Sequence, residues 1–238
     1  MNVLENIKNG LIVSCQAEEG SPFNTPKGVG DFARCAELGG AVGIRSCGVE
    51  KSRYIMQNTS LPVICLTKST FEDGFVRITG SFEEVETLLK INATFIAVDG
   101  TYRIREKTYT GPDYINKIKK MYPEILVMAD ISTPQEAVAC YEAGADCVST
   151  TLNGYTSDTQ SVNHNQPSFS VLQECIRLLP HGFPIMAEGR FNKPEYAAQA
   201  IEEGAWAVIV GTSITRPQII TQWYVDAIKQ TIEQSHLS

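Results

Sequence analysis

The sequence predicts a single (β/α)8 barrel, the TIM-barrel fold of the α/β class. Short apolar runs, each ending at a polar residue, recur about every 28 residues between positions 16 and 211. A strand, its crossover helix and two loops need about 30 residues, so a chain of 238 residues accommodates eight such units. The runs do not alternate between apolar and polar residues, which is typical of parallel strands covered on both faces.

The elements follow in order along the chain. The eight expected strands are Leu11–Cys15, Val42–Ile44, Val63–Thr67, Phe95–Val98, Ile125–Ala129, Cys147–Val148, Ile185–Ala187 and Ala207–Val210. Helix starts are marked by a capping residue with glutamate three positions later, at Ser81–Glu84, Thr133–Glu136 and Asn192–Glu195. Segments 33–44, 138–148 and 198–208 resemble one another as helix, glycine and strand, which supports a repeating unit.

The chain is expected to form one domain. No linker rich in proline, glycine or serine divides it, so residues 1–238 are expected to form the barrel, with a short frayed tail near 234–238 and the longest βα loop at 152–167. The main alternative is a doubly wound open sheet. That fold normally carries a glycine-rich phosphate loop after its first strand, where this chain has Ser14-Cys15-Gln16.

Composition limits the classes of partner. With 20 Lys+Arg against 27 Asp+Glu, the net charge of −7 argues against a nucleic-acid or anionic-membrane surface, but not against a small anionic ligand. No apolar stretch is long enough to span a bilayer. Seven cysteines without a C-x-x-C pair, and no leader-like N-terminus, predict reduced thiols in a cytoplasmic protein. Three scattered histidines make a metal site improbable on sequence grounds.

Polar residues directly follow most of the expected strands. In a barrel, catalytic side chains project from the C-terminal ends of the strands, so these residues are expected to share one rim. They are Gln16, Arg45, Lys68, Asp99, Asp130, Thr151 and Glu188. Burying a charge without a partner is costly, so a structural ion network that closes the barrel mouth is the alternative for any one of them.

The last two units predict a phosphate site. Gly189 and Arg190 follow the seventh strand, and a turn that opens a helix follows the eighth, with Gly211, Thr212, Ser213 and Arg216. Glycine permits close backbone approach, exposed N–H groups favour an anion, and arginine adds charge. Tight turns alone would explain the glycines, but they explain Arg216 poorly.

Six motifs in collinear order resemble those of the N-acetylmannosamine-6-phosphate 2-epimerases. They are Leu11–Ala17, Gly43–Arg45, Met128–Thr133, Ser149–Thr156, Ala187–Arg190 and Val210–Pro217. The resemblance implies a (β/α)8 barrel that interconverts N-acetylmannosamine 6-phosphate and N-acetylglucosamine 6-phosphate in sialic acid catabolism. It also implies that no metal or organic cofactor takes part.

The resemblance implies roles for most of the rim residues. Lys68 matches the catalytic lysine and Glu188 a second catalytic carboxylate. Three residues match positions that hold the open-chain sugar: Gln16, Arg45 and Asp130. Five lie in the region that binds the phosphate: Gly189, Arg190, Gly211, Thr212 and Arg216. Thr151, Tyr155 and Ser213 are added as substrate or phosphate contacts from their place in these loops. The chain departs from the family after Lys68, where it has Ser69-Thr70-Phe71.

Inversion at C2, next to the C1 aldehyde of the open-chain sugar, requires a base and stabilisation of an enolate. The hypothesis is that Lys68 moves the C2 proton, that Glu188 is its acid/base partner or handles ring opening, and that Arg45 stabilises charge on O1. Asp99 is expected in a supporting position, beside Lys68 or in an ion pair. The alternatives are a Schiff-base aldolase that uses Lys68 and a non-catalytic sugar-phosphate-binding barrel. Exposed helix faces permit a homodimer.

Overall fold

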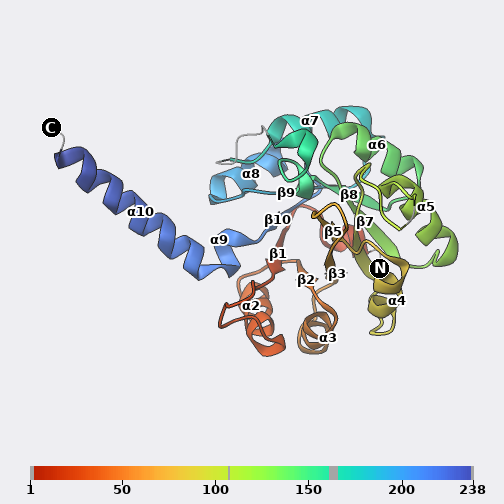
Figure 1. Cartoon of the computed structure of the whole chain (residues 1–238), viewed down its shortest axis with the longest axis horizontal. Helices are drawn as coiled ribbons and strands as arrows, with labels where there is room; N and C mark the ends of the chain where they lie inside the picture. The colour runs from red at the N-terminus through yellow and green to blue at the C-terminus, as the bar shows by residue number, and fades with distance from the viewer. Residues whose placement is uncertain (1–2, 107, 161–165, 237–238) are drawn as a thin grey trace.

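The computed structural model describes residues 3–106, 108–160 and 166–236. Within them, eight parallel strands close into a barrel in the order β1-β10-β9-β8-β7-β6-β3-β2, which confirms the predicted (β/α)8 fold (Figure 1). The barrel strands are β1 (Leu11–Cys15), β2 (Gly43–Cys47), β3 (Val63–Leu66), β6 (Phe95–Asp99), β7 (Leu126–Asp130), β8 (Cys147–Ser149), β9 (Ile185–Glu188) and β10 (Ala207–Val210).

Helices surround the barrel and connect its strands. They are α2 (Pro26–Leu38), α3 (Val49–Asn58), α4 (Phe82–Leu89), α5 (Gly111–Met121), α6 (Pro134–Glu142), α7 (Phe169–Leu178) and α8 (Pro194–Glu202). The short helix α1 (Val3–Asn6) lies at the end where the strands begin. There the indole N–H of Trp206 donates to the carbonyl of Leu4 at 2.7 Å, which fixes α1 against the barrel.

The observed helix starts can be compared with those predicted from the capping residues. Capping boxes are present at Ser81 and Thr133, as expected, and a third, not predicted, is present at Thr110. The prediction that Asn192 is the N-cap residue of the next helix is wrong. Helix α8 begins one residue later, after Lys193, because Pro194 occupies the first helical position, which its fixed φ favours.

Successive strand residues face opposite sides of the sheet, and two buried clusters result. The larger cluster lies between the strands and the helices and includes Ile96 and Val98 of β6. The second fills the barrel and includes Phe95 and Ala97 of the same strand. Residues that continue the inward alternation toward the strand ends therefore point into the barrel mouth, and there they are polar.

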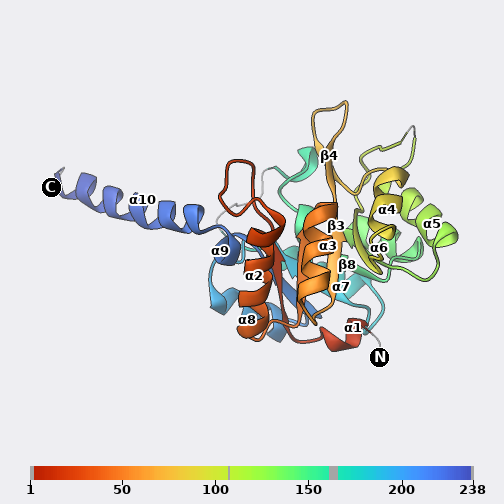
Figure 2. The same ribbon diagram turned by 90° about the horizontal axis from the view of Figure 1, so that it is seen from below.

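The segment after β3 forms a hairpin. Strands β4 (Lys68–Thr70) and β5 (Val76–Ile78) pair antiparallel and project from the end of the molecule where the barrel strands finish (Figure 2). The expected third strand, Val63–Thr67, ends at Leu66, so Lys68 opens the hairpin two residues later. This segment contains the departure from the family pattern at Ser69–Phe71.

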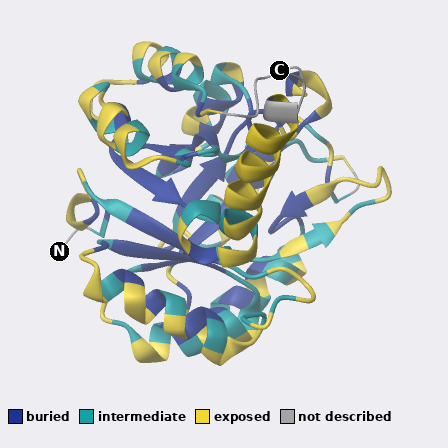
Figure 3. Ribbon diagram, turned by 90° about the vertical axis from the view of Figure 1, so that its left-hand side faces the viewer, coloured by how far each residue is buried: buried dark blue, intermediate teal, exposed yellow. Residues whose placement is uncertain are grey.

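The C-terminal helix α10 (Pro217–His236) follows the short helix α9 (Thr212–Thr215) and points away from the barrel (Figure 1). Its surface is exposed along nearly its whole length (Figure 3). Residues 237–238 of the tail expected to fray, and 161–165 of the expected longest loop, lie outside the described residues. Across the described chain, none of the helices combines the length and apolar character that a bilayer span requires.

Candidate active site

The site lies at the end of the barrel where the strands finish. A pocket of about 600 Å³ opens there between the strand ends, the β4–β5 hairpin and the turns after β9 and β10. The predicted residues that line it are Gln16, Arg45, Lys68, Thr151, Tyr155, Glu188, Gly189, Arg190, Gly211, Thr212, Ser213 and Arg216. The sequence expectation of one shared rim is therefore matched by the geometry, with Asp99 and Asp130 buried beneath it.

Arg45 is the centre of a buried ion network. Its guanidinium donates to both carboxylate oxygens of Asp130, at 2.9 and 2.6 Å, and to Oε2 of Glu188 at 2.7 Å. The arginine side chain is 1% exposed and Asp130 is fully buried. Because the inward alternation of β2 continues past the expected strand end at Ile44, Arg45 lies within the strand and points into the barrel.

Glu188 closes this network from β9. Its Oε2 atom also lies 2.8 Å from the hydroxyl of Thr151 and 3.3 Å from that of Ser149. Burial raises the pKa of the Glu188 carboxyl above its usual value; the negative charge of Asp130 acts in the same direction, and Arg45 opposes it. A carboxyl with a raised pKa is suited to acid/base catalysis near neutral pH.

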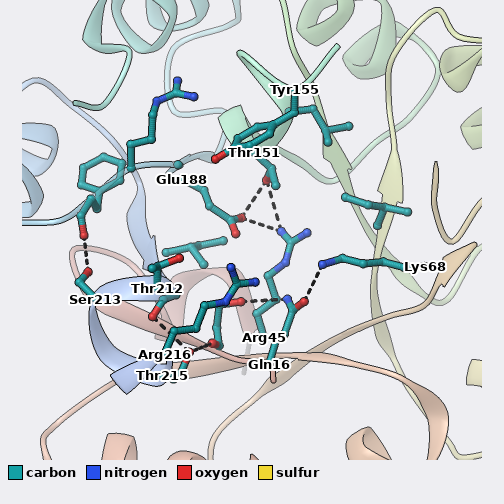
Figure 4. A pocket seen from close by; sticks show the side chains of 18 of the residues that line it. Gln16, Arg45, Lys68, Thr151, Tyr155, Glu188, Thr212, Ser213, Thr215 and Arg216 are labelled. Atoms are coloured by element: carbon teal, nitrogen blue, oxygen red, sulfur yellow. Dashed lines mark hydrogen bonds and ion pairs between the residues drawn. The ribbon is translucent and has the colours of Figure 1, made fainter. Parts of the chain in front are cut away.

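Lys68 faces Glu188 across the pocket. Strands β3 and β9 are four places apart in the ring of eight, so side chains that extend from their ends come from opposite walls (Figure 4). The Lys68 amine donates to Oε1 of Gln16 at 2.8 Å, and the amide nitrogen of Gln16 donates to the Ser14 hydroxyl at 2.9 Å. Gln16 therefore holds an otherwise exposed amine toward the pocket.

The turn after β9 differs from the expected phosphate contact. Gly189 and Arg190 both have left-handed backbone angles, with φ of 108° and 61°. The guanidinium of Arg190 donates to the carbonyls of Asn153 and Gln166, at 2.9 and 3.0 Å, and lies 5.7 Å from the ring of Tyr155. As placed, this side chain anchors the β8–α7 loop, so phosphate binding by its guanidinium stays a prediction.

The turn after β10 carries the other predicted phosphate residues. The hydroxyl of Ser213 donates to the carbonyl of Phe191 at 2.6 Å, which ties this turn to the one after β9. Arg216, at the pocket mouth, forms an ion pair with Glu18 at 2.6 Å. Gly211 has an ordinary φ of −112°, so its backbone does not require glycine. The arginine is in place to meet an anion that displaces Glu18.

Asp99 belongs to a separate ion network. Its carboxylate accepts from Arg103 at 2.6 Å and from Arg105 at 3.2 Å, and from the Thr101 hydroxyl at 2.7 Å. This is the ion-pair arrangement rather than a contact with Lys68. Sequence reasoning missed Arg103, which lines the pocket, because it lies in the loop after β6 and follows no apolar run.

Sequence reasoning also missed an apolar wall on the pocket, formed by Phe75 and Val76 of the hairpin. No strand-end signal marks these residues, because the β3–α4 connection was expected to be a loop. Within the described residues, no group of three His, Cys, Asp or Glu side chains gathers as it would around a metal ion.

Comparison with known proteins decides the family. Residues 29–230 match the family model described as "Putative N-acetylmannosamine-6-phosphate epimerase". The chain belongs to this family. A protein of Caldanaerobacter subterraneus subsp. tengcongensis described as a putative N-acetylmannosamine-6-phosphate 2-epimerase is 41% identical, and the match covers 97% of this chain and 95% of that protein. A protein of Clostridioides difficile with the same description is also 41% identical, and the match covers 95% of this chain and 99% of that protein.

A solved structure of the N-acetylmannosamine-6-phosphate 2-epimerase from Clostridium perfringens superposes with a TM-score of 0.87. It is 36% identical in sequence, and the match covers 95% of this chain and 96% of that one. A thiamine phosphate pyrophosphorylase from Pyrococcus furiosus, 16% identical with a TM-score of 0.61, shares the fold over 90% of both chains. Membership of the epimerase family agrees with the resemblance carried by the six motifs.

Proposed function

We propose that this protein interconverts N-acetylmannosamine 6-phosphate and N-acetylglucosamine 6-phosphate, a reaction of sialic acid catabolism. The observation that carries the proposal is the placement of Lys68 and Glu188 on opposite walls of one pocket. An amine and a carboxyl that flank a bound sugar can exchange protons with it from two sides. Family membership over nearly the whole chain favours this reaction over a Schiff-base aldolase or a non-catalytic binding barrel.

The reaction begins at C2 of the open-chain sugar. The C2–H bond breaks, its proton passes to the neutral amine of Lys68, and the electron pair becomes an enolate shared with O1. The Glu188 carboxyl, on the opposite wall, gives its proton to the other face of C2, and this yields the epimer. Gln16 holds the Lys68 amine at 2.8 Å, so the base is positioned before substrate arrives.

Arg45 takes a different part from the one expected. Its guanidinium is 1% exposed and is already bonded to Asp130 and Glu188. We therefore assign it to holding the Glu188 carboxyl in place rather than to contact with O1 of the sugar.

The proposal is tested by incubating the protein with N-acetylmannosamine 6-phosphate and following the anomeric and C2 proton signals by NMR. We expect signals of N-acetylglucosamine 6-phosphate to grow toward equilibrium, and the reverse reaction to reach the same ratio. Unphosphorylated N-acetylmannosamine is the matched control and should react far more slowly. Inert substrate in the presence of folded protein would refute the assignment. Borohydride trapping of an adduct on Lys68 would favour the aldolase.

Arg216→Ala is expected to raise KM for the phosphorylated sugar by about 10- to 100-fold with a smaller change in kcat. The reason is loss of one charge-assisted hydrogen bond to the phosphate, which contributes about 1.5–3 kcal/mol. Steady-state kinetics measure the change. Glu18→Gln is the matched control, because it removes the partner of Arg216 and should leave KM unchanged or lower it. A KM that does not move in Arg216→Ala would show that the phosphate binds elsewhere.

We also propose that the protein is a homodimer in which helix α10 packs against the partner. Tyr224, Ile228 and Ile232 are spaced four residues apart, so they form one stripe along the helix, and they are 71%, 62% and 50% exposed. In a (β/α)8 barrel, the helix after the last strand normally joins the outer ring. Here that helix points away from it (Figure 1). The α10 helix of the partner can cover the part of the barrel's outer surface against which this chain's own α10 does not pack.

Light scattering coupled to size exclusion tests the dimer. We expect twice the chain mass of 26.2 kDa for the wild type, and a shift toward the single-chain mass for Ile228→Glu, because a charge in the apolar stripe opposes packing. Gln230→Glu adds the same charge on another face of α10 and should remain dimeric. A monomeric wild type at micromolar concentration would contradict the proposal.

A cytoplasmic location is the remaining part of the proposal. It is supported by the seven cysteines, all of which are free thiols in the structure. Thiols of this kind persist in a reducing compartment.

A further inference from the structure

The hydroxyl of Thr151 lies at the meeting point of two buried carboxyl groups. Its Oγ1 atom is 2.6 Å from Oδ1 of Asp130, 2.8 Å from Oε2 of Glu188 and 2.9 Å from the hydroxyl of Ser149. Figure 4 shows the contact between Thr151 and Glu188 beside the guanidinium of Arg45. Three oxygen atoms therefore surround a fourth at hydrogen-bond distance, and each of the three contacts requires a proton between its two oxygens.

Counting the protons shows that the two hydroxyls are insufficient. Thr151 and Ser149 supply one proton each, whereas the three contacts need three. Arg45 does not supply the third. The two protons on its Nη1 atom are directed to Asp130 at 2.9 Å and Glu188 at 2.7 Å, and Thr151 lies farther away at 3.4 Å. The third proton must therefore be on a carboxyl group.

The two carboxyl groups differ in how many hydrogen bonds from Arg45 favour their charged form. Asp130 receives two parallel hydrogen bonds from Arg45, at 2.9 and 2.6 Å, the bidentate geometry that favours the charged form most. Glu188 receives one hydrogen bond from the same arginine. We infer that the resting enzyme carries a proton on Glu188, which donates to Thr151, and that Thr151 in turn donates to Asp130 while it accepts from Ser149.

In this arrangement Thr151 is a positioning residue rather than a substrate contact. Its hydroxyl lies 2.6, 2.8 and 2.9 Å from Asp130, Glu188 and Ser149, and with one proton of its own it can donate to one of them and accept from the other two. The charged groups that face Glu188 are Arg45 from β2 and Asp130 from β7, with Lys68 on the opposite wall. Burial raises the pKa of the Glu188 carboxyl, as does the charge of Asp130, whereas Arg45 and hydrogen bonds from Thr151 and Ser149 to the ionised form lower it.

The inference concerns the catalytic use of Glu188 and, to that extent, rests on the proposed function. A protonated Glu188 meets the sugar as an acid, whereas an ionised one would meet it as a base. The protonation itself is a property of the free protein and does not depend on which sugar binds.

Infrared difference spectroscopy of the substrate-free protein near neutral pH tests the proton directly. We expect the C=O stretching band of a protonated carboxyl in the wild type and its loss in Glu188→Gln. Glu136→Gln is the matched control and should keep the band. Glu136 is also a buried glutamate, but its carboxylate accepts from the Ser132, Thr133 and Tyr102 backbone N–H groups and is expected to be ionised. A wild type without the band, or a band that survives in Glu188→Gln, would overturn the inference.

Two variants of Thr151 test the direction of its hydrogen bond. Thr151→Val removes the acceptor of the Glu188 proton, so the titration midpoint of the band should fall by about one pH unit. Valine has nearly the same shape as threonine, so the burial of Glu188 should change little. Thr151→Ser keeps the hydroxyl and should titrate close to the wild type. A midpoint that rises in Thr151→Val would show that Thr151 donates to an ionised Glu188, and would refute the proton chain. These spectra contain no substrate, so their outcome is separate from that of the epimerase assay.

Discussion

Lys68→Ala is expected to lower kcat by about 1000-fold, because a positioned base contributes about 10²- to 10⁴-fold to a proton transfer. The fold should be retained. Lys68 is exposed and its one hydrogen bond, to Gln16, lies at the pocket surface, so the free energy of unfolding should change by less than about 0.5 kcal/mol. Steady-state kinetics and thermal unfolding of the same preparation measure both quantities.

Lys51→Ala is the matched control for this variant. Lys51 is the third residue of α3, and its amine donates to the side-chain oxygen of Asn24 rather than to a pocket residue. Loss of this lysine should therefore leave kcat within a few-fold of the wild type. A Lys68→Ala protein that turned over at a similar rate would show that another group removes the C2 proton.

Arg45→Met is expected to cost about 3–5 kcal/mol of stability, because it leaves the Asp130 carboxylate buried without a positive partner and removes a hydrogen bond to Glu188. For a chain of this length that corresponds to a fall of about 10 °C in Tm. Activity should be lost as well, since the Glu188 carboxyl is no longer held. Differential scanning calorimetry gives the Tm, and circular dichroism below it shows whether the barrel forms.

Arg53→Met is the comparison for this prediction. Its guanidinium also pairs with a glutamate, Glu50 at 2.9 Å, but both side chains are largely exposed. Exposed pairs contribute little, so this change should shift stability by less than about 1 kcal/mol. Adding Asp130→Asn to Arg45→Met should restore part of the loss, because it removes the unpaired charge of Asp130. Equal effects of the two arginine changes would contradict the account of the buried network.

The convergence of the rim residues could be predicted from sequence because it follows from a simple geometric rule. Parallel strands in a closed barrel all end on the same side, and alternate residues point inward. A polar residue at the inward position just past an apolar run must then enter the mouth. This rule brought Arg45, Lys68 and Glu188 into one pocket although they are far apart in the chain, with Asp130 buried beneath them.

The partners of those residues could not be predicted in the same way. Arg190 was expected at the phosphate, yet its left-handed backbone and the carbonyls of Asn153 and Gln166 direct its side chain to the β8–α7 loop. The direction of a side chain in a turn depends on the path of a neighbouring loop, which no local pattern records. The β4–β5 hairpin could not be predicted for the same reason, because its pairing depends on which segments meet after β3.

The position of α10 was also beyond sequence reasoning. Its apolar stripe at Tyr224, Ile228 and Ile232 indicates a helix that packs against something, but the spacing is the same whether the surface belongs to this chain or to another. Only the course of the backbone after α9 shows that the helix points away from its own barrel (Figure 1).

Removal of the C2 proton of the sugar by Lys68 is tested by running the reaction in D2O. The carboxyl proton of Glu188, which is delivered to the opposite face of C2, exchanges rapidly with solvent, so the hydrogen that reaches C2 should be deuterium. NMR of N-acetylmannosamine 6-phosphate incubated with the protein in D2O should therefore show loss of the C2 proton signal in the epimer formed. In Lys68→Ala both epimer formation and exchange should be about 1000-fold slower. Complete conversion to an epimer that keeps its original C2 proton would contradict the account.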